Sequence, residues 1–254
     1  MDPVSPIQVV EQFHLLFLAH LTRGSDKRTI VVKGGCNLRF FLQSVRYSED
    51  MDLDVEGVDT LVLRDRVRGI LASRPFTQQL ESRGIALEHV TEHKQTPTVQ
   101  RWKFGLAVGN VARPFPTRIE FSRRGIDEGV EFGSLDATLI AGYRLAPFMA
   151  SHYGAAAALR QKAGALAGRM APQARDVFDL HHLIAGGAPL SALAAMDRDV
   201  VAQAQARATD MGFSAFASQV VSYLTPESQA RYLSPEVWDT IVLEVADALG
   251  RSGR

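Results

Sequence analysis

The 254-residue sequence lacks several features that would assign it to a specialised class of protein. It has a single cysteine, Cys36, which cannot form a disulfide within the chain, so we expect a reducing, cytoplasmic location. No apolar run approaches the roughly 18 residues that a membrane-spanning helix needs, so we expect no membrane partner. The first residues, Met-Asp-Pro, also lack the basic and then apolar pattern of a secretory signal.

An excess of charge of one sign is absent too, because 28 basic residues balance 28 acidic residues. This balance argues against a surface that is basic all over, but it leaves room for a local basic cleft that binds phosphates. The hydrophobic share of 46% and the charged share of 22% are those of an ordinary globular protein, neither fibrous nor disordered. The length suits one large domain or two modest ones, and we find no internal repeat and no low-complexity linker.

The chain changes character near residue 155, from mixed periodicity to helical periodicity with abundant alanine. We therefore predict an α/β (α+β) core over residues 1–150, with a mixed sheet and flanking helices, followed by a helical domain over residues 151–254. The helices expected from apolar spacing and from breaks at Gly and Pro are 9–21, 36–43, 59–73, 155–169, 173–186 and 234–249. The expected strands are 29–33, 50–55, 85–93, 99–109 and 116–124.

The segment DMDLDV, residues 50–55, places an acid at every second position. Solvated surface charge is the usual fate of acidic runs, and a calcium-binding loop also begins with this spacing of aspartates. The calcium loop is excluded, because its sixth position requires Gly where this chain has Val55. The alternation instead predicts a half-buried strand with Asp50, Asp52 and Asp54 on one face, roughly 7 Å apart. Such carboxylates repel one another unless a cation such as Mg²⁺ lies between them.

Two further segments give this acidic strand a context. Gly34-Gly35 follows the apolar strand and opens a short helix, where glycine lets backbone amides approach a phosphate closely. The segment is not a Walker P-loop, since no Gly-Lys-Ser/Thr follows, and a plain strand-to-helix turn is the alternative interpretation. Glu120 lies between two apolar residues of an expected strand, which makes it a candidate third carboxylate for two-metal chemistry. Taken alone, Glu120 would equally be an exposed acid on an ordinary strand.

Four segments together resemble the nucleotidyltransferase superfamily of DNA polymerase β type, and more closely the AbiEii/AbiGii family of nucleotidyltransferase toxins from type IV toxin–antitoxin systems. They are KGGCNLRF (33–40), RYSEDMDLD (46–54), QKAGALAGR (161–169) and ARDVFDLHHL (174–183). They occur in the order typical of that family and span about residues 30–183. The resemblance implies the nucleotidyltransferase fold, with the helical half completing the active site.

The resemblance further implies an enzyme that uses a nucleoside triphosphate and Mg²⁺, with two ions expected and Mn²⁺ as a substitute. The expected metal-binding residues are Asp50, Asp52 and Glu120, and the expected catalytic set adds Lys162 and Asp176. The expected nucleotide-binding residues are Lys33, Gly34, Gly35, Arg46, Ser48, Lys162 and Arg169. For Ser48 the alternative is that its hydroxyl shapes the turn into the acidic strand.

Charges on the two later helices have alternative interpretations as well. Lys162 and Arg169 lie seven residues apart and can face one side of a helix, either to bind a triphosphate or as solvated charges. The resemblance makes Asp176 an active-site acid, whereas we expect Asp179 to pair with Arg175 or Lys162 and to hold its helix in place.

Three further residues, Cys36, His181 and His182, lie within the matched segments. Cys36 stands where the family has a hydroxyl residue, and a thiol is the poorer donor to a phosphate oxygen. We expect Cys36 to face the phosphate, the alternative being a small buried thiol. His181 and His182 have no partner at metal-ligand spacing, so we expect both to be structural. After about residue 190 we find no further motif.

The expected reaction is nucleotidyl transfer to an acceptor hydroxyl, with pyrophosphate as the leaving group. The resemblance implies a toxin that blocks growth, the 3′ end of tRNA as acceptor, and a cognate antitoxin as partner. Two other functions remain open: transfer to a protein or small-molecule hydroxyl, and a catalytically silent nucleotide-binding protein. Only Cys36 supports the silent protein, whereas the intact Asp50, Asp52 and Lys162 oppose it.

Overall fold

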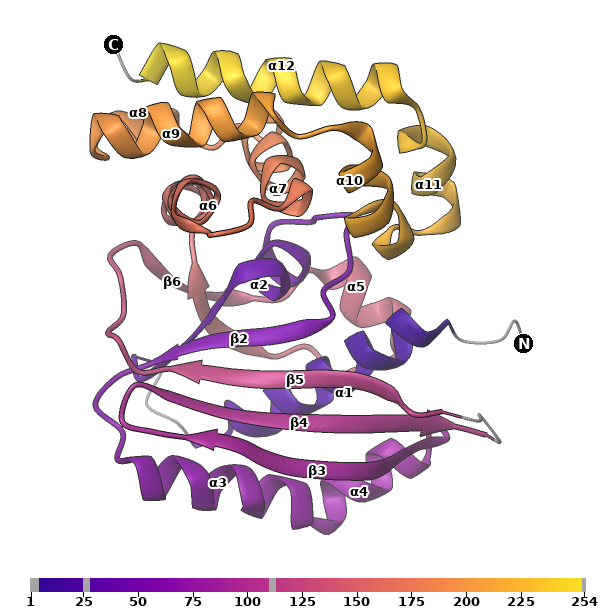
Figure 1. Cartoon of the computed structure of the whole chain (residues 1–254). Helices are drawn as coiled ribbons and strands as arrows, with labels where there is room; N and C mark the ends of the chain where they lie inside the picture. The colour runs from indigo at the N-terminus through magenta and orange to yellow at the C-terminus, as the bar shows by residue number, and fades with distance from the viewer. Residues whose placement is uncertain (1–4, 25–27, 110–112, 253–254) are drawn as a thin grey trace. The chain divides into compact units, whose positions relative to one another are not determined.

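A mixed seven-stranded sheet forms the framework of the first of two units into which the chain divides (Figure 1). The computed structural model describes residues 5–24, 28–109 and 113–252. The first unit is Met1–Phe41 with Tyr47–His152, and the second is Leu42–Arg46 with Tyr153–Arg254. The strand order is β3-β4-β5-β2-β1-β7-β6. The strands are β1 (Ile30–Lys33), β2 (Asp50–Val55), β3 (Ile85–Gln95), β4 (Val99–Val108), β5 (Phe115–Ser122), β6 (Val130–Ser134) and β7 (Met149–Tyr153).

Strand β2 lies inside this sheet, antiparallel to β1 and parallel to β5. Its apolar residues Met51 and Leu53 are fully buried, whereas Asp50 and Asp52, between them in sequence, are only partly buried. Successive side chains of a strand point to opposite faces, so the burial pattern assigns the apolar residues to the core and the acids to the other face of the sheet.

The core of the first unit lies on that apolar face, where helices α1 (Pro6–Leu21), α3 (Thr60–Ala72) and α4 (Arg74–Glu81) cover the strands (Figure 1). The ring of Phe13 from α1 lies 4.9 Å from that of Phe104 in β4 and 6.1 Å from that of Phe76 in α4, measured between centroids. Each such buried side chain contributes about 1.5–3 kcal/mol relative to an exposed one. The remaining helices of this unit are α2 (Gly34–Phe41), which packs on β1 and β2, and α5 (Ala137–Gly142).

The second unit is helical, and α6 packs against α7 and α9, while α12 packs against α7 and α9. Its core includes the stacked rings of Phe216 and Trp238, whose centroids are 4.3 Å apart. The segment Leu42–Arg46 joins this unit through a β-bridge between Arg46 and Leu224. The elements are α6 (Ala155–Gly168), α7 (Ala174–Ala185), α8 (Ser191–Ala194), α9 (Arg198–Thr209), α10 (Phe213–Gln219), η1 (Val221–Tyr223), α11 (Pro226–Tyr232) and α12 (Pro235–Ser252).

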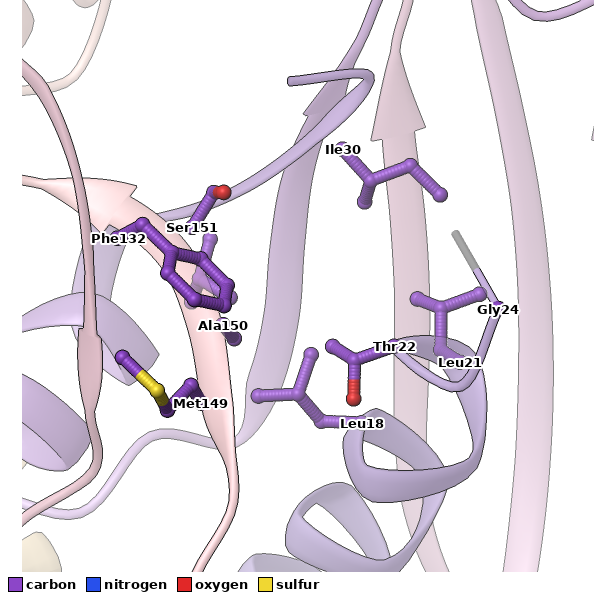
Figure 2. A pocket seen from close by; sticks show the side chains of 10 residues that line it. Leu18, Leu21, Thr22, Gly24, Ile30, Phe132, Met149, Ala150 and Ser151 are labelled. Atoms are coloured by element: carbon purple, nitrogen blue, oxygen red, sulfur yellow. The ribbon is translucent and has the colours of Figure 1, made fainter. Parts of the chain in front are cut away.

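A cavity of about 210 Å³ lies in the first unit beside the end of α1 (Figure 2). Leu18 of α1, Phe132 of β6 and Met149 of β7 line it together with Ile30 and Val32 of β1. Alternation puts these two β1 residues on the face opposite to Lys33, so the cavity does not belong to the acidic face of the sheet.

The expected mixed sheet with flanking helices and a helical second half is confirmed. Every helix and strand predicted from the sequence is present, with ends shifted by a few residues. The elements that were not predicted from the sequence are α4, α5, β6, β7, α8, α9, α10, η1 and α11. No helix of the described residues has both the length and the apolar character required to cross a membrane.

Candidate active site

Three acids expected to bind metal lie on one face of two neighbouring strands of the first unit. Asp52 of β2 lies directly opposite Glu120 of β5, and Asp50 lies opposite Arg118. On the other side of β2, Lys33 of β1 lies opposite Asp52. Side chains directly opposite each other on paired strands share a face of the sheet. The pairing register therefore brings together an acidic face that the sequence separates by almost 70 residues.

Two of these acids bind arginine side chains. The guanidinium of Arg118 lies 3.0 Å from the Asp50 carboxylate, and that of Arg101 lies 2.5 Å from the Glu120 carboxylate. Burial raises the pKa of Asp50 to about 6, and Arg118 only partly opposes this rise. Asp50 is therefore held in its charged form less strongly than an isolated aspartate.

The donor set of this face fits a hard divalent cation, because carboxylate oxygens are the ligands that Mg²⁺ prefers. Among the described residues, however, no three acidic, histidine or cysteine side chains are already arranged around a common metal position. Arg118 contacts one carboxylate oxygen of Asp50 and Arg101 contacts one of Glu120, so a cation that binds both acids has to share these carboxylates with the guanidinium groups or displace them.

The glycine turn expected to bind phosphate lies beside these acids. Gly34 has a φ of +66°, a conformation that side-chain-bearing residues rarely adopt, and it opens helix α2. A Cβ atom at Gly34 would lie 3.3 Å from the Asp52 carboxylate oxygen. Glycine therefore allows both the turn and the close approach of the backbone to Asp52. The turn forms the N-terminus of α2, where free backbone amides suit an anion.

Cys36 does not face a phosphate, and this expectation was wrong. The side chain is buried in the core of the first unit, where its thiol donates a hydrogen bond to the Asp50 carbonyl oxygen at 3.3 Å. Burial raises the pKa of the thiol well above its usual value. The Ser48 hydroxyl donates to the same carbonyl at 2.8 Å, and so it shapes the turn into β2. The alternative of a small buried thiol is confirmed.

A buried histidine, which the sequence analysis did not single out, supports the same turn. His14 of α1 lies 2.8 Å from the Thr117 hydroxyl through Nε2, and that hydroxyl donates to the Glu49 carbonyl oxygen at 2.6 Å. The threonine hydrogen is thereby used, so Nε2 of His14 carries the donated proton and Nδ1 faces the thiol of Cys36 at 3.8 Å. Burial lowers the pKa of His14 to about 3 and keeps the ring neutral.

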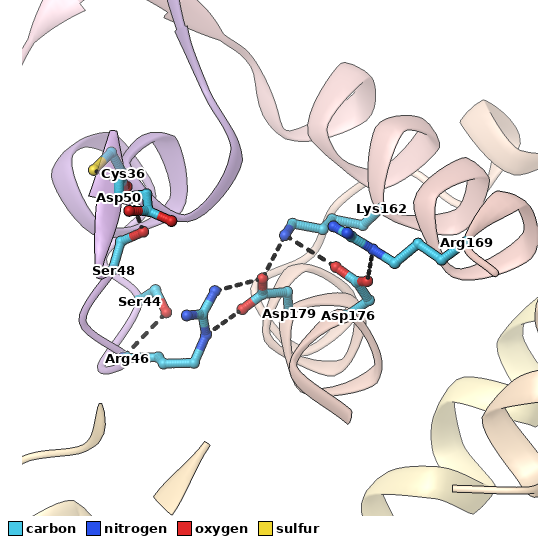
Figure 3. A network of polar contacts seen from close by, with 9 residues as sticks. All are labelled: Cys36, Ser44, Arg46, Ser48, Asp50, Lys162, Arg169, Asp176 and Asp179. Atoms are coloured by element: carbon cyan, nitrogen blue, oxygen red, sulfur yellow. Dashed lines mark hydrogen bonds and ion pairs between the residues drawn. The ribbon is translucent and has the colours of Figure 1, made fainter. Parts of the chain in front are cut away.

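The second unit contains a separate, buried network of charges (Figure 3). Lys162 of α6 lies 2.6 Å from the Asp179 carboxylate and 3.4 Å from that of Asp176, both on α7. Arg169 lies 2.8 Å from Asp176, and Arg46 contacts both carboxylate oxygens of Asp179 at 2.9 and 2.7 Å. Both aspartates are fully buried, whereas 38% of the Arg169 side chain is exposed.

The network keeps Asp179 in its charged form. Burial alone would raise the pKa of Asp179, but Arg46 and then Lys162 hold that pKa well below its usual range. Asp179 thus stays charged, and each of the two aspartates orients two cations. Pairing of Asp179 with Lys162 was expected, whereas its pairing with Arg46, 133 residues away, left no signal in the sequence.

The two histidines of α7 have structural contacts, as expected. His181 Nε2 lies 3.0 Å from the exposed Glu244 carboxylate of α12, and His182 Nε2 lies 2.7 Å from the Leu42 carbonyl oxygen. Arg101 and Arg118 were not predicted as site residues. Arg118 lies two positions before Glu120 on β5 and so shares its face, and Arg101 of β4 lies directly opposite Glu120.

The chain is similar in sequence to one protein family and in structure to several solved proteins. The profile of the family described as nucleotidyl transferase AbiEii toxin, type IV TA system, matches residues 16–237. JHP933 from Helicobacter pylori is similar with a TM-score of 0.57 and 19% identity, over 97% of this chain and 90% of its own. The nucleotidyltransferase toxin MenT4 from Mycobacterium tuberculosis H37Rv is similar with a TM-score of 0.61 and 20% identity, over 95% of this chain and 85% of its own. At these identities the structural likeness shows a common fold, and no curated protein matches in sequence.

Proposed function

We propose, because the chain belongs to the AbiEii family of nucleotidyl transferase toxins of type IV toxin–antitoxin systems, that it transfers a nucleotide from a nucleoside triphosphate to the 3′ end of a tRNA. Membership makes the chain a nucleotidyltransferase and implies a cognate antitoxin. The proposal adds the acceptor, the metal and the residues that act. The observation that carries it is the face of Asp50, Asp52 and Glu120 beside the glycine turn at Gly34.

In the proposed reaction the first unit binds the reacting groups. The amides of Gly34 and Gly35 bind the triphosphate at the start of α2. Mg²⁺, as two ions or with Mn²⁺ as a substitute, would be held by Asp50, Asp52 and Glu120, and when bound it activates the acceptor hydroxyl and neutralises the leaving pyrophosphate. Glu120 serves the acceptor side, because β5 lies on the far side of β2 from β1 and the glycine turn.

The second unit contributes the cations of its network in this proposal. Lys162 binds the triphosphate as a compact positive charge, and the partly exposed Arg169 assists it. Asp176 is fully buried and already binds both cations, so we assign it the role of positioning them and not of an acid that touches substrate.

Three residues that the sequence analysis assigned to the nucleotide already have partners within their own unit. Lys33 lies 2.5 Å from the Asp54 carboxylate, Arg46 binds Asp179, and Ser48 binds the Asp50 carbonyl oxygen. We therefore propose that all three support the site and do not bind the nucleotide directly.

A labelled-nucleotide transfer assay tests the proposal. The purified protein is incubated with Mg²⁺, total cellular RNA, total cellular protein and each labelled nucleoside triphosphate in turn, and the RNA, protein and small-molecule fractions are separated. We expect label at RNA 3′ ends, in the tRNA size range, and none with Asp52→Ala. Label confined to protein or to small molecules would identify the alternative acceptors. Absence of label in every fraction, together with nucleotide binding, would identify a silent binding protein.

A further inference from the structure

The acidic face of the sheet continues into a row of basic side chains on the next strands. The pairing register extends the row of Asp52 and Glu120 to Arg101 of β4 and Lys94 of β3. It extends the neighbouring row, which holds Asp50, through Arg118 of β5 to Lys103 of β4. We call Lys94, Arg101, Lys103 and Arg118 the basic strip. Strands β3, β4 and β5 lie side by side in Figure 1, so the strip is continuous with the acids.

The strip has more positive charge than its surroundings neutralise. Arg101 and Arg118 pair with Glu120 and Asp50, whereas Lys94 and Lys103 are exposed and make no ion pair with any residue in the described parts of the chain. Lys103 also lies directly opposite Arg118. Like charges opposite each other in a sheet are destabilising, so this arrangement gains nothing for the fold alone.

Cation binding at the acids increases this excess. If Asp50 and Glu120 bind a metal ion, the ion takes up negative charge that Arg118 and Arg101 now neutralise, so the excess of positive charge on three adjacent strands grows. The side chains of Arg101 and Arg118 are already 25% and 37% exposed, so they can turn to a ligand without unpacking the core. An anion with several charges in a row is the ligand that satisfies this surface.

We propose that the basic strip binds consecutive phosphates of a polynucleotide acceptor and so places its terminal hydroxyl beside Asp50 and Glu120. The proposal rests on the function proposed above and specifies how the acceptor is held. The order of the strands supports it, because the glycine turn lies next to β1, the acids lie on β2 and β5, and the strip lies on β5, β4 and β3. The nucleotide phosphates and the strip thus lie on opposite sides of the acids.

A triphosphate could also bind the strip, since it has the same chemistry, and separate measurements distinguish the two sources of phosphate. The variants are Lys103→Gln and the double variant Lys94→Gln with Lys103→Gln. The charge-matched control is Arg74→Gln, which removes one exposed charge from α4 on the opposite face of the sheet. Lys103→Arg keeps the charge and serves as the rescue. All substituted side chains are exposed, so we expect every variant to fold like the wild type, which thermal melting verifies.

The first measurement is binding of a fluorescent single-stranded RNA and of total tRNA at several salt concentrations, and the second is binding of each nucleoside triphosphate. For Lys103→Gln we expect RNA affinity to fall about three- to tenfold and the slope of log affinity against log salt to decrease by about 0.7, twice that for the double variant. Triphosphate affinity should stay unchanged, and Lys103→Arg should restore RNA binding.

The outcomes separate the two proposals. If the wild type labels RNA but Lys103→Gln binds RNA as tightly as Arg74→Gln does, the basic strip does not bind the acceptor. The proposed function then stands without the inference. A loss of triphosphate affinity equal to the loss of RNA affinity assigns the strip to the nucleotide and also overturns the inference. A wild type that neither binds nor labels RNA overturns both proposals.

Discussion

The two units set the charge of their aspartates in opposite ways. In the first unit, burial raises the pKa of Asp50 to about 6. The single arginine beside it, Arg118, is partly exposed and opposes this rise only in part. In the second unit, Asp179 is fully buried, yet Arg46 and Lys162 hold its pKa well below the usual range. Burial therefore does not decide the charge state of these acids; the number and closeness of the cations around them do.

This difference separates acids that can exchange their partner from acids that cannot. Asp50 and Glu120 each bind one arginine near solvent, a kind of contact that is worth little and is easily replaced by a stronger cation. Asp176 and Asp179 are themselves fully buried and each bind two cations, so the loss of one partner leaves an uncompensated charge. We infer that the first set reacts and the second set holds Lys162 and Arg169 in position.

The largest expected effect is on activity in the first set. Asp50→Ala and Asp52→Ala should each abolish detectable transfer, because a bound metal ion supplies several kcal/mol of transition-state stabilisation. Stability should hold or rise, since one member of a like-charged pair is removed. Transfer is measured with labelled nucleotide in Mg²⁺, and stability by thermal melting. The control is Glu88→Ala, an exposed acid of β3. Near-normal transfer by either aspartate variant would show that the acid does not bind the metal.

The next effect is on stability in the second set. Asp179→Ala should lower the free energy of unfolding by about 3–5 kcal/mol, because Arg46 and Lys162 are left buried without their shared partner. Chemical denaturation measures this, with Asp247→Asn as the control, since Asp247 forms an exposed pair with Arg251 and its loss should change little. If both variants unfold at the same denaturant concentration, the network does not stabilise the unit.

A smaller effect separates catalysis from binding within the first set. Glu120→Gln should reduce transfer by about 100-fold, which equals about 2.7 kcal/mol, while nucleotide affinity stays within about twofold of wild type. The reason is that Glu120 serves the acceptor side, whereas the triphosphate is bound elsewhere. Single-turnover rates and nucleotide titration give the two quantities. A variant unable to bind nucleotide would move Glu120 to the nucleotide side of the site.

The sequence predicts local patterns of this molecule well and distant contacts poorly. Alternation in DMDLDV places β2 correctly, and Ser234-Pro235 marks the start of α12 at Pro235. Strand β6 is exposed or half-exposed at all five positions, and its alternation is limited to Val130 and Phe132, which is too short to distinguish a strand from a loop. The pair of Arg46 and Asp179 depends on tertiary packing over 133 residues, which periodicity cannot report. Cys36 was misplaced for a related reason, because one residue after a turn gives no period from which its direction can be read.

The pH dependence of the free energy of unfolding tests whether the buried His14 stays neutral in the folded chain. The pKa of His14 is about 3 in the folded chain against 6.5 when unfolded, so the unfolded state binds the proton first as pH falls. Stability from this group is complete well above pH 6.5 and declines as pH falls toward 3, with a total loss of about 2.7 kcal/mol at pH 4.5, two pH units below 6.5 at 1.36 kcal/mol per unit. His14→Gln should flatten the decline over that range in denaturant titrations, and His93→Gln, at an exposed position, should not. Parallel curves for wild type and His14→Gln would show that His14 is protonated in the folded chain as well.

The smallest expected effect concerns Cys36, which lies beneath the backbone of Asp50. Cys36→Ser replaces a thiol that packs against apolar residues and donates to the Asp50 carbonyl oxygen at 3.3 Å. A hydroxyl keeps a donor for that carbonyl but is more costly to bury, so we expect a net loss of about 1 kcal/mol in the free energy of unfolding. Nucleotide affinity should not change, because the side chain points into the core and not toward a phosphate.

Two measurements on this variant decide between a buried thiol and a phosphate ligand. Thermal melting should show a lowered midpoint, and nucleotide titration should give the wild-type affinity. Cys36→Ala, which removes the donor without adding a hydroxyl, separates the loss of packing from the cost of the buried polar group. If Cys36→Ser bound nucleotide several-fold more tightly at unchanged stability, the hydroxyl would be donating to a phosphate oxygen, as a charge-assisted hydrogen bond worth about 1.5–3 kcal/mol would allow. The turn would then have to rotate when nucleotide binds, and the backbone beneath Asp50 would belong to the reacting part of the first unit and not to its fixed support.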